Sequence, residues 1–274
     1  MPWKCAAALS PAGDIASHCD RKSILARPLK AGIIGLPMLE AFGQSDRGRL
    51  RPNNEDAFLI AADIGLYVVA DGMGGAAGGE VASRLAVEAV EQAVRSTTER
   101  TPAVLTGAIE LAHRRVRQAA EADLSLKGMG TTVVAALEAG AELLIASVGD
   151  SRAYAFRDGR LEQLTTDQTW AEEVGRRLGL SEEQIRTHAL RHVLTMAVGS
   201  SEPLRVQAVR LPLTPGLEIL LSTDGLHGVV DTSTLAEVVK KPISLSCQAH
   251  YLIEAATKAG GPDNVTVVLL RVIE

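Results

Sequence analysis

The chain has 274 residues, of which 46 % are hydrophobic and 22 % charged, and its formal net charge is −5 at pH 7. This composition supplies a sizeable core and excludes a globally disordered chain. The negative charge argues against a nucleic-acid-binding protein, and no apolar run reaches the ~18 residues that a membrane helix needs.

The first forty residues differ from the rest, because Pro and Gly interrupt them and no period is sustained. We expect residues 1–40 to form a poorly ordered N-terminal extension and residues 41–274 to form one folded domain. Met38 is a candidate alternative start, since periodic sequence begins just after it. Peptides from before residue 38 in the native protein would reject that start.

The early part of the domain predicts two strands and then two helices. Short apolar runs at 57–62 and 66–70 predict neighbouring strands. Polar residues recur with a helical period from Gly79 to Arg95. Thr101 and Pro102 then provide an N-cap and a first-turn proline for a helix that runs to about Asp123. Two successive helices exclude a simple strand–helix–strand alternation here.

The middle of the chain predicts antiparallel strands. Turn signals at 138–141 and 157–160 separate apolar runs and predict hairpins. The expected strands cover residues 131–137, 142–148, 153–156 and 161–164. A capping box at 181–184 lies inside a polar region, residues 168–188, that we expect to be helical.

The last part of the chain predicts strands at 205–211 and 217–222, a helix from Ser244 to Gly260, and a final strand at 265–272. Antiparallel strands with paired helices early and late favour an α+β fold. We expect a four-layer α-β-β-α sandwich, in which two antiparallel sheets are flanked by helices.

Acidic residues stand at the ends of several apolar strands. In YVVADGMGGAAGGE, Tyr67–Glu80, a buried run ends in a bare carboxylate followed by glycines, which let a ligand approach closely. The acids in comparable positions are Glu55, Asp56, Asp71, Asp150, Asp224 and Asp263. Any one alone is best explained as a turn residue beside Gly. Brought together, they would repel one another strongly unless cations bind.

The donor atoms of these six side chains indicate which cation would bind. All six side chains offer hard oxygens, which favour Mg²⁺ or Mn²⁺ over Zn²⁺. Two such ions about 4 Å apart can bridge a water, lower its pKa and hold a phosphoryl group for in-line attack. Arg51 lies shortly before Glu55 and is the expected phosphate-binding cation. Six acids, Arg51 and two ions leave a charge of about −1, so we expect a third, weaker metal position.

At these residues the sequence resembles the metal-dependent Ser/Thr protein phosphatases of type 2C, the PPM family, and its bacterial branch in particular. The matching motifs follow the family's order: RPNNEDA (51–57), VVADGMGG (68–75), GMGTTVV (128–134), GDSRAY (149–154), LSTDGL (221–226) and DNVTVV (263–268). The resemblance covers residues 41–274 and implies a catalytic domain with a flap at about 165–200. The family fold, two antiparallel sheets flanked by helices, agrees with the fold expected above.

The resemblance also implies roles for the metal-binding residues. Asp71 is expected to bridge two ions, Mn²⁺ or Mg²⁺, with the carbonyl of Gly72 on one of them. Asp224 and Asp263 are expected to bind the other ion. Asp150 resembles the acid that is associated with a third ion in bacterial members.

Three further residues are implied in catalysis. Glu55 and Asp56 are expected to act through metal-bound water or to hold the metal shell, and Arg51 resembles the phosphate-binding arginine. Residues 130–132 either support the site or simply open a strand. The implied reaction is hydrolysis of phosphoserine and phosphothreonine by a metal-bridged water or hydroxide.

The resemblance implies phosphorylated proteins as partners, among them Ser/Thr kinases and their substrates. We expect a role in signal transduction, a monomer, and no nucleic-acid or membrane partner. The three cysteines, Cys5, Cys19 and Cys247, form an odd and sparse set that suits a reducing compartment, so we expect a cytoplasmic protein.

Met73 departs from the pattern of many eukaryotic members, in which a histidine at this position is thought to protonate the leaving oxygen. A serine alkoxide is a poor leaving group and needs a proton, which a metal-bound water can supply. His188 and His192 lie in the flap segment THALRHVLTMAVG and are candidates for a catalytic role, although surface or packing roles explain them better. Trp170 and His227 are expected to be packing residues.

Two other classes of function have a basis in the sequence. Residues 72–77 spell G-x-G-x-x-A between a strand and a helix, as in a dinucleotide-binding oxidoreductase. Asp71 disfavours it, because its charge would lie beside the pyrophosphate, and saturable NADH binding would revive it. A non-enzymatic metal-binding module is the second alternative, and it would lack Mn²⁺-dependent hydrolysis of p-nitrophenyl phosphate.

Overall fold

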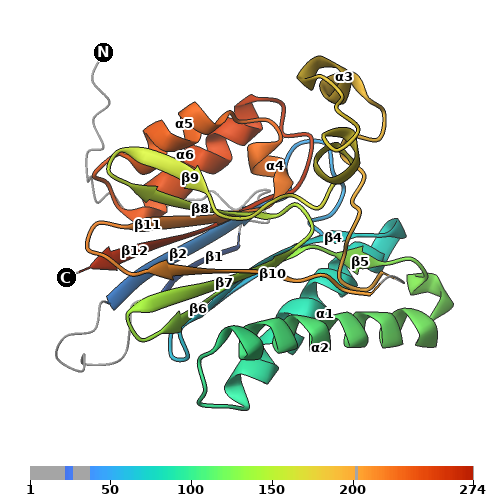
Figure 1. Ribbon diagram of the computed structural model, residues 1–274, viewed down its shortest axis with the longest axis horizontal. Helices are drawn as coiled ribbons and strands as arrows, with labels where there is room; N and C mark the ends of the chain where they lie inside the picture. The colour runs from blue at the N-terminus through green and yellow to red at the C-terminus, as the bar shows by residue number, and fades with distance from the viewer. Residues whose placement is uncertain (1–21, 27–37, 201–202, 274) are drawn as a thin grey trace, which may run out of the picture.

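The computed structural model describes residues 22–26, 38–200 and 203–273. Two antiparallel sheets face each other, and helices cover the outer face of each sheet (Figure 1). The expected four-layer α-β-β-α arrangement is therefore confirmed. Within the described ranges, no helix is both long and apolar enough to cross a bilayer.

The first sheet has the strand order β1-β2-β12-β11-β8-β9. Its strands are β1 Lys22–Ala26, β2 Met38–Asp46, β8 Arg152–Arg157, β9 Arg160–Gln163, β11 Glu218–Ser222 and β12 Val265–Ile273. The last strand pairs with β2, so that Val265 stands opposite Asp46. This pairing brings the loop after β2 and the loop before β12 to the same edge of the molecule.

The second sheet has the order β10-β7-β6-β4-β3, and the short β5 also pairs with β4. Its strands are β3 Asp56–Ala61, β4 Leu66–Met73, β5 Gly130–Thr131, β6 Val133–Ala139, β7 Glu142–Val148 and β10 Gln207–Pro212. In the β3–β4 ladder, Asp56 stands opposite Asp71. Two of the acids expected in the site are thus neighbours on adjacent strands.

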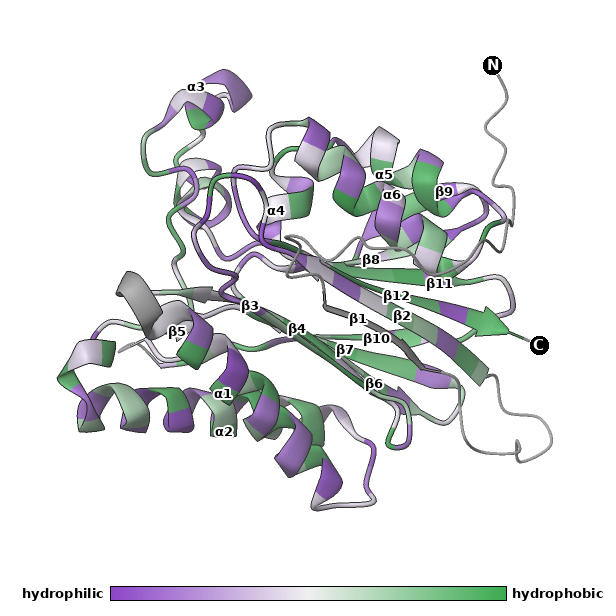
Figure 2. Ribbon diagram, turned by 180° about the vertical axis from the view of Figure 1, so that it is seen from behind, coloured by the Kyte–Doolittle hydropathy of each residue, from purple (hydrophilic) through white to green (hydrophobic). Residues whose placement is uncertain are grey.

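The helices divide between the two outer faces. The second sheet is covered by α1 Gly75–Arg95 and α2 Pro102–Ala122, and the first by α4 Asp224–His227, α5 Thr232–Val239 and α6 Leu245–Lys258. Figure 2 shows both polar and apolar residues along these helices, as an amphipathic pattern requires. The expected cap of α2 is present, because the Thr101 side chain accepts a hydrogen bond from the Val104 N–H.

Three hydrophobic cores hold the layers together. The central core lies between the sheets and is mainly aliphatic, with Leu39, Val69, Ile145, Leu221 and Val268 buried in it. Side chains alternate along a strand, so the remaining apolar residues of each strand pack under the helices. Each sheet is therefore packed on both faces, and the acidic residues lie at the strand ends.

The flap region differs from the helix expected over residues 168–188. It contains a single wide turn at Ala171–Gly175 and a short helix, α3 Glu182–Thr187. The expected capping box is present, since Ser181 and Gln184 exchange side-chain-to-backbone hydrogen bonds. Gly179 adopts a φ of 71°, in the left-handed region, and this ends the turn before α3 begins.

The sequence did not predict β1, β2, α4 or α5, nor the short 3-10 turn at Leu124–Leu126. β1 and the start of β2 fall within residues 1–40, where we expected poor order, and residues 1–21 and 27–37 lie outside the described residues. The formation of β2 depends on pairing with the distant β12, which no local pattern reveals. Cys5 and Cys19 lie outside the described residues as well, and Cys247 is a free thiol.

Candidate active site

A cleft of about 910 Å³ opens at one end of the two sheets. Its lining includes seven of the eight residues expected in the site: Arg51, Glu55, Asp71, Gly72, Asp150, Asp224 and Asp263. Asp56 is the exception, although its carboxylate interacts electrostatically with Asp224 and Asp263. Acids from five separate segments of the chain thus lie close together.

Asp71 and Asp224 both line the cleft, and the charge of Asp224 acts on Asp71. Burial, followed by the charges of Asp56 and Asp224, holds the pKa of Asp71 well above its ordinary value. Burial and the charge of Asp263 raise the pKa of Asp224. A divalent ion would compensate the repulsion that raises these pKa values.

The pKa values of Asp56 and Asp150 are raised as well, and burial is the main cause. Asp56 Oδ2 accepts hydrogen bonds from Thr266 Oγ1 at 2.6 Å and Thr223 Oγ1 at 3.0 Å. Burial nevertheless raises the pKa of Asp56 to about 7. Burial, and next the charge of Asp224, raises the pKa of Asp150 to about 7. The fold thus holds both carboxyl groups in place although their charged forms are unfavourable there.

The cluster fits divalent cations in its chemistry. Two buried carboxylate oxygens, Asp56 Oδ1 and Asp224 Oδ1, have no hydrogen-bond partner, and the cleft offers hard oxygen donors without any cysteine. Among the described residues, no three acidic, histidine or cysteine side chains are already arranged as a ligand group. Asp263 is instead paired with Arg51.

Arg51 lies in the loop between β2 and β3 and forms an ion pair with Asp263, with 2.7 Å between Nη2 and Oδ2. The Arg51 side chain is 48 % exposed, so the ion pair lies at the mouth of the cleft. The hydrogen bond to Asp263 raises the pKa of Arg51, which therefore stays positively charged.

The sequence analysis did not single out Asn264, which organises this loop. Its Oδ1 accepts a hydrogen bond from the Glu55 N–H at 2.8 Å, and its Nδ2 donates to the carbonyls of Arg47 and Asn53 at 2.9 Å each. Asn264 therefore fixes the loop carrying Arg51 and Glu55 beside Asp263. The Asp-Asn pair in DNVTVV was the available signal, since Asn often bonds to loop backbone.

The strand opening at residues 130–132 supports the Asp71 backbone. Thr132 Oγ1 accepts from the Asp71 N–H at 2.9 Å, and Thr131 Oγ1 donates to the Asp71 carbonyl at 2.8 Å. A Cβ at Gly72 would lie 2.1 Å from the Gly79 carbonyl oxygen and 2.5 Å from that of Glu55. Glycine is thus required here for close backbone packing against α1 and the Glu55 loop.

The histidines of the flap occupy different environments. His192 lines the cleft, where its charge acts on Asp224. His188 instead stacks on Trp170, with ring centroids 3.8 Å apart. His227 is partly buried, and its hydrogen bonds reach Ser222 Oγ and the Asp150 backbone. Burial lowers the pKa of His227 well below its ordinary value, so it stays neutral.

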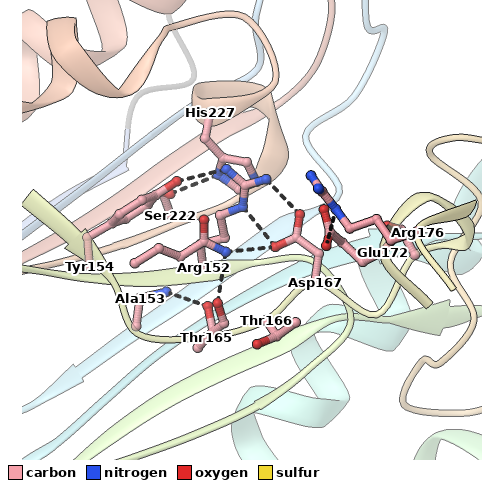
Figure 3. Close-up of polar contacts among 12 residues, drawn as sticks. Arg152, Ala153, Tyr154, Thr165, Thr166, Asp167, Glu172, Arg176, Ser222 and His227 are labelled. Atoms are coloured by element: carbon pink, nitrogen blue, oxygen red, sulfur yellow. Dashed lines mark hydrogen bonds and ion pairs between the residues drawn. The ribbon is translucent and has the colours of Figure 1, made fainter. Parts of the chain in front are cut away.

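A partly buried ion pair holds the start of the flap against β8 (Figure 3). Arg152 donates to both carboxylate oxygens of Asp167, at 2.8 Å from Nε and 2.6 Å from Nη2. It also donates to Tyr154 Oη at 3.0 Å, while the Ala153 N–H donates to Thr165 Oγ1 at 3.2 Å. The strand that follows Asp150 is thereby joined to the flap.

Gln168 joins both ends of the flap to the turn that carries Asp150. Its Oε1 accepts from the Gly149 N–H at 2.8 Å, and its backbone N–H donates to the Gly149 carbonyl at 3.0 Å. Its Nε2 donates to the Arg205 carbonyl at 2.8 Å, beyond the far end of the flap. The Gln168 side chain is buried, so these bonds are shielded from water.

Comparisons with known proteins identify relatives of this chain. The sequence profile of protein phosphatase 2C matches residues 44–252. The serine/threonine phosphatase stp of Listeria welshimeri is 35 % identical over 236 residues, which cover 83 % of this chain and 94 % of that protein.

Solved structures are also similar. The crystal structure of the Mycobacterium tuberculosis serine/threonine phosphatase PstP/Ppp has a TM-score of 0.80 and 35 % identity, and the match covers 86 % of this chain and 99 % of that one. The catalytic domain of PstP in complex with two manganese ions has a TM-score of 0.78 and 36 % identity, covering 87 % and 100 %.

Proposed function

Since this chain belongs to the protein phosphatase 2C family and is a metal-dependent serine/threonine protein phosphatase, we propose how its cleft residues divide the reaction. Asp71, Asp224, Asp263 and the Gly72 carbonyl would hold two Mn²⁺ or Mg²⁺ ions, and Asp150 would hold a third. The observation that carries this proposal is the gathering of partly buried acids around Asp71 and Asp224, with Arg51 beside them.

When bound, the ions supply Lewis acidity and positive charge at the acidic cluster. The protein's part is to hold the surrounding acids in a fixed geometry. Two threonine hydroxyls orient Asp56, and Asn264 fixes the backbone of Glu55. We assign Glu55 and Asp56 to this holding role, in which they orient water and ligands around the site.

Arg51 receives the substrate phosphate in this proposal. A guanidinium can donate two parallel hydrogen bonds to phosphate oxygens. Arg51 must first leave Asp263, and the exposure of the pair makes this exchange inexpensive. The same movement frees the Asp263 carboxylate to turn toward an ion.

Met73 lines the cleft but its thioether cannot donate a proton. The leaving serine or threonine oxygen therefore takes its proton from water or from His192, whose imidazole also lines the cleft. A pH–rate profile of His192→Gln that matches wild type would assign this role to water.

Phosphorylated proteins are the substrates, and among them we propose Ser/Thr kinases and their targets, in signal transduction. We further propose a monomeric, cytoplasmic enzyme, which the sparse cysteines favour.

The activity is tested with p-nitrophenyl phosphate and a phosphothreonine peptide, each with Mn²⁺ and with EDTA. Phosphate release in Mn²⁺ that EDTA abolishes is the expected result. Folded, Mn²⁺-loaded protein that hydrolyses neither substrate would contradict the activity and favour a non-enzymatic metal-binding module.

A further inference from the structure

A second groove, of about 370 Å³, adjoins the catalytic cleft. We call it the flanking groove, and it lies between the C-terminal part of α2 and the residues leading into β5, which are close together in Figure 1. Met73, Ala197 and Ser200 line both the cleft and this groove, so the two are continuous. A chain that places one residue in the cleft can place its neighbours in the groove.

The charges of the flanking groove differ from those of the cleft. Arg117 and Lys127 line it, with Glu121 as the one acid in its lining. Arg117 pairs with Glu121 at 3.4 Å across an exposed helix turn, and such a pair is weak. The exposed ammonium of Lys127 has no ion pair or hydrogen bond within the described part of the chain. The groove is thus a local positive site in a protein of net charge −5.

The groove is open around Gly128. Gly128 and Gly130 lie on either side of Met129, and a Cβ built on Gly128 would meet nothing within 4 Å. An extended chain advances about 3.3–3.6 Å per residue, so the residues within a few positions of the phosphorylated one reach the groove.

We propose that the flanking groove binds acidic residues close to the phosphoserine or phosphothreonine of a substrate protein, through Lys127 and Arg117. This inference rests on the proposed function, because it names the sequence context that the same active site prefers. An acidic residue of the substrate can form an ion pair with Lys127. It can also replace Glu121 as the partner of Arg117 at little cost, because the Arg117–Glu121 pair is exposed and weak. The acids of the cleft repel the same residue, which gives it a defined place in the groove.

The test compares two phosphothreonine peptides that differ only in their flanking residues, Glu in one and Gln in the other. Wild-type protein with Mn²⁺ is expected to favour the Glu peptide by about three- to tenfold in kcat/KM, the scale of one or two exposed ion pairs. Lys127→Glu should abolish or reverse this preference, and Lys127→Gln should reduce it. The preference should also shrink at high salt, since exposed charges are screened.

Arg160→Glu provides the matched control, because it makes the same charge change at an exposed position on β9 in the other sheet. It should keep the wild-type preference, and all variants should hydrolyse p-nitrophenyl phosphate within twofold of wild type, as this small substrate does not reach the groove. Equal turnover of both peptides by wild type, or an unchanged preference in Lys127→Glu, would overturn the proposal. Loss of p-nitrophenyl phosphate hydrolysis by wild type would instead refute the proposed function.

Discussion

Asp71 and Asp224 lie together in the cleft, and the pKa of each carboxyl group is raised above its ordinary value, mainly by burial. Burial and mutual repulsion make their charged forms costly. A divalent ion would compensate that charge directly. Among the single residues of the cleft, these two are expected to link metal binding most closely to activity.

Replacement of Asp71 or Asp224 by Asn should each lower kcat/KM for p-nitrophenyl phosphate by at least about a hundredfold, since even outer-shell changes cost 10- to 100-fold. The melting temperature of the metal-free variants should match or exceed that of wild type, because a repelling charge is removed. Asp158→Asn is the matched control, in an exposed hairpin turn where Asn tolerates the observed φ of 53°. Near-wild-type rates in either cleft variant would refute the metal assignment.

Arg51 should matter for substrate more than for metal. Arg51→Ala is expected to lower kcat/KM by about 10- to 100-fold, the value of a hydrogen-bonded charge contact, mostly through KM. Mn²⁺ affinity, measured by calorimetry, should be unchanged or higher, since Asp263 loses its competing partner. Arg51→Lys should recover part of the activity, because it keeps the charge without the bidentate geometry. A loss of Mn²⁺ binding equal to the loss of activity would argue against this role.

At the scale of elements, the flap is an irregular segment that is attached at both of its ends. Gln168 connects the turn before Asp150 to Arg205, and the Arg152–Asp167 pair connects the flap to β8. An ion pair between Glu173, within the flap, and Arg205, beyond its far end, provides a further attachment. These attachments compensate for the lack of a continuous helix.

Gln168→Ala should lower the free energy of unfolding by about 2–4 kcal/mol, because it leaves the buried Gly149 N–H and the Arg205 carbonyl without partners. Gln118→Ala, at an exposed position of α2, is the control and should change stability by less than about 0.5 kcal/mol. Chemical denaturation of both variants provides the measurement. Equal stability of the two variants would mean that water replaces the Gln168 bonds.

At the scale of the whole molecule, the hydrophobic layers hold acids together that repel one another. In the folded protein the pKa values of Asp56 and Asp150 rise to about 7 from an ordinary 3.8. The folded state therefore binds more protons than the unfolded state between these pH values, and stability falls as pH rises through that window. Groups with a lowered pKa, such as Asp231 at about 2, affect stability only at lower pH.

Metal-free protein should accordingly lose stability between pH 6.5 and pH 8, with a fall of roughly 2–4 °C in melting temperature. The pKa values of His113 and His227 are lowered in the folded protein, and unfolded histidines are still about half protonated at pH 6.5, so these two residues offset part of the fall. Mn²⁺ should raise the melting temperature more at pH 8 than at pH 6.5. If the melting temperature in EDTA instead rose between pH 6.5 and pH 8, the cleft acids would not be the groups that control stability in this range.

The topology also bears on the dinucleotide-binding alternative. The motif at residues 72–77 does lie between β4 and α1, as that alternative requires. However, α1 leads into α2 instead of a parallel strand, and every strand pair described here is antiparallel. Gly72 serves close packing of backbone against Gly79, so the glycines have another explanation.

The sequence by itself determined the sandwich fold, both long helices with the cap of α2, and the acids of the cleft. These features depend on local periodicity, on capping residues and on acids that end apolar strands, all of which can be read within short windows. Arg51 and Glu55 could be paired with the site because they are close in sequence to one of its strands.

Only the tertiary structure decided the pairing of β2 with β12, the irregular flap, the role of Asn264, and the ion pair between Arg51 and Asp263. It also showed that a glycine is required at position 72 because the backbones of Gly79 and Glu55 lie too close for a Cβ. Each of these depends on groups far apart in the chain, whose meeting is set by the packing of the two sheets. No local pattern in the sequence contains that information.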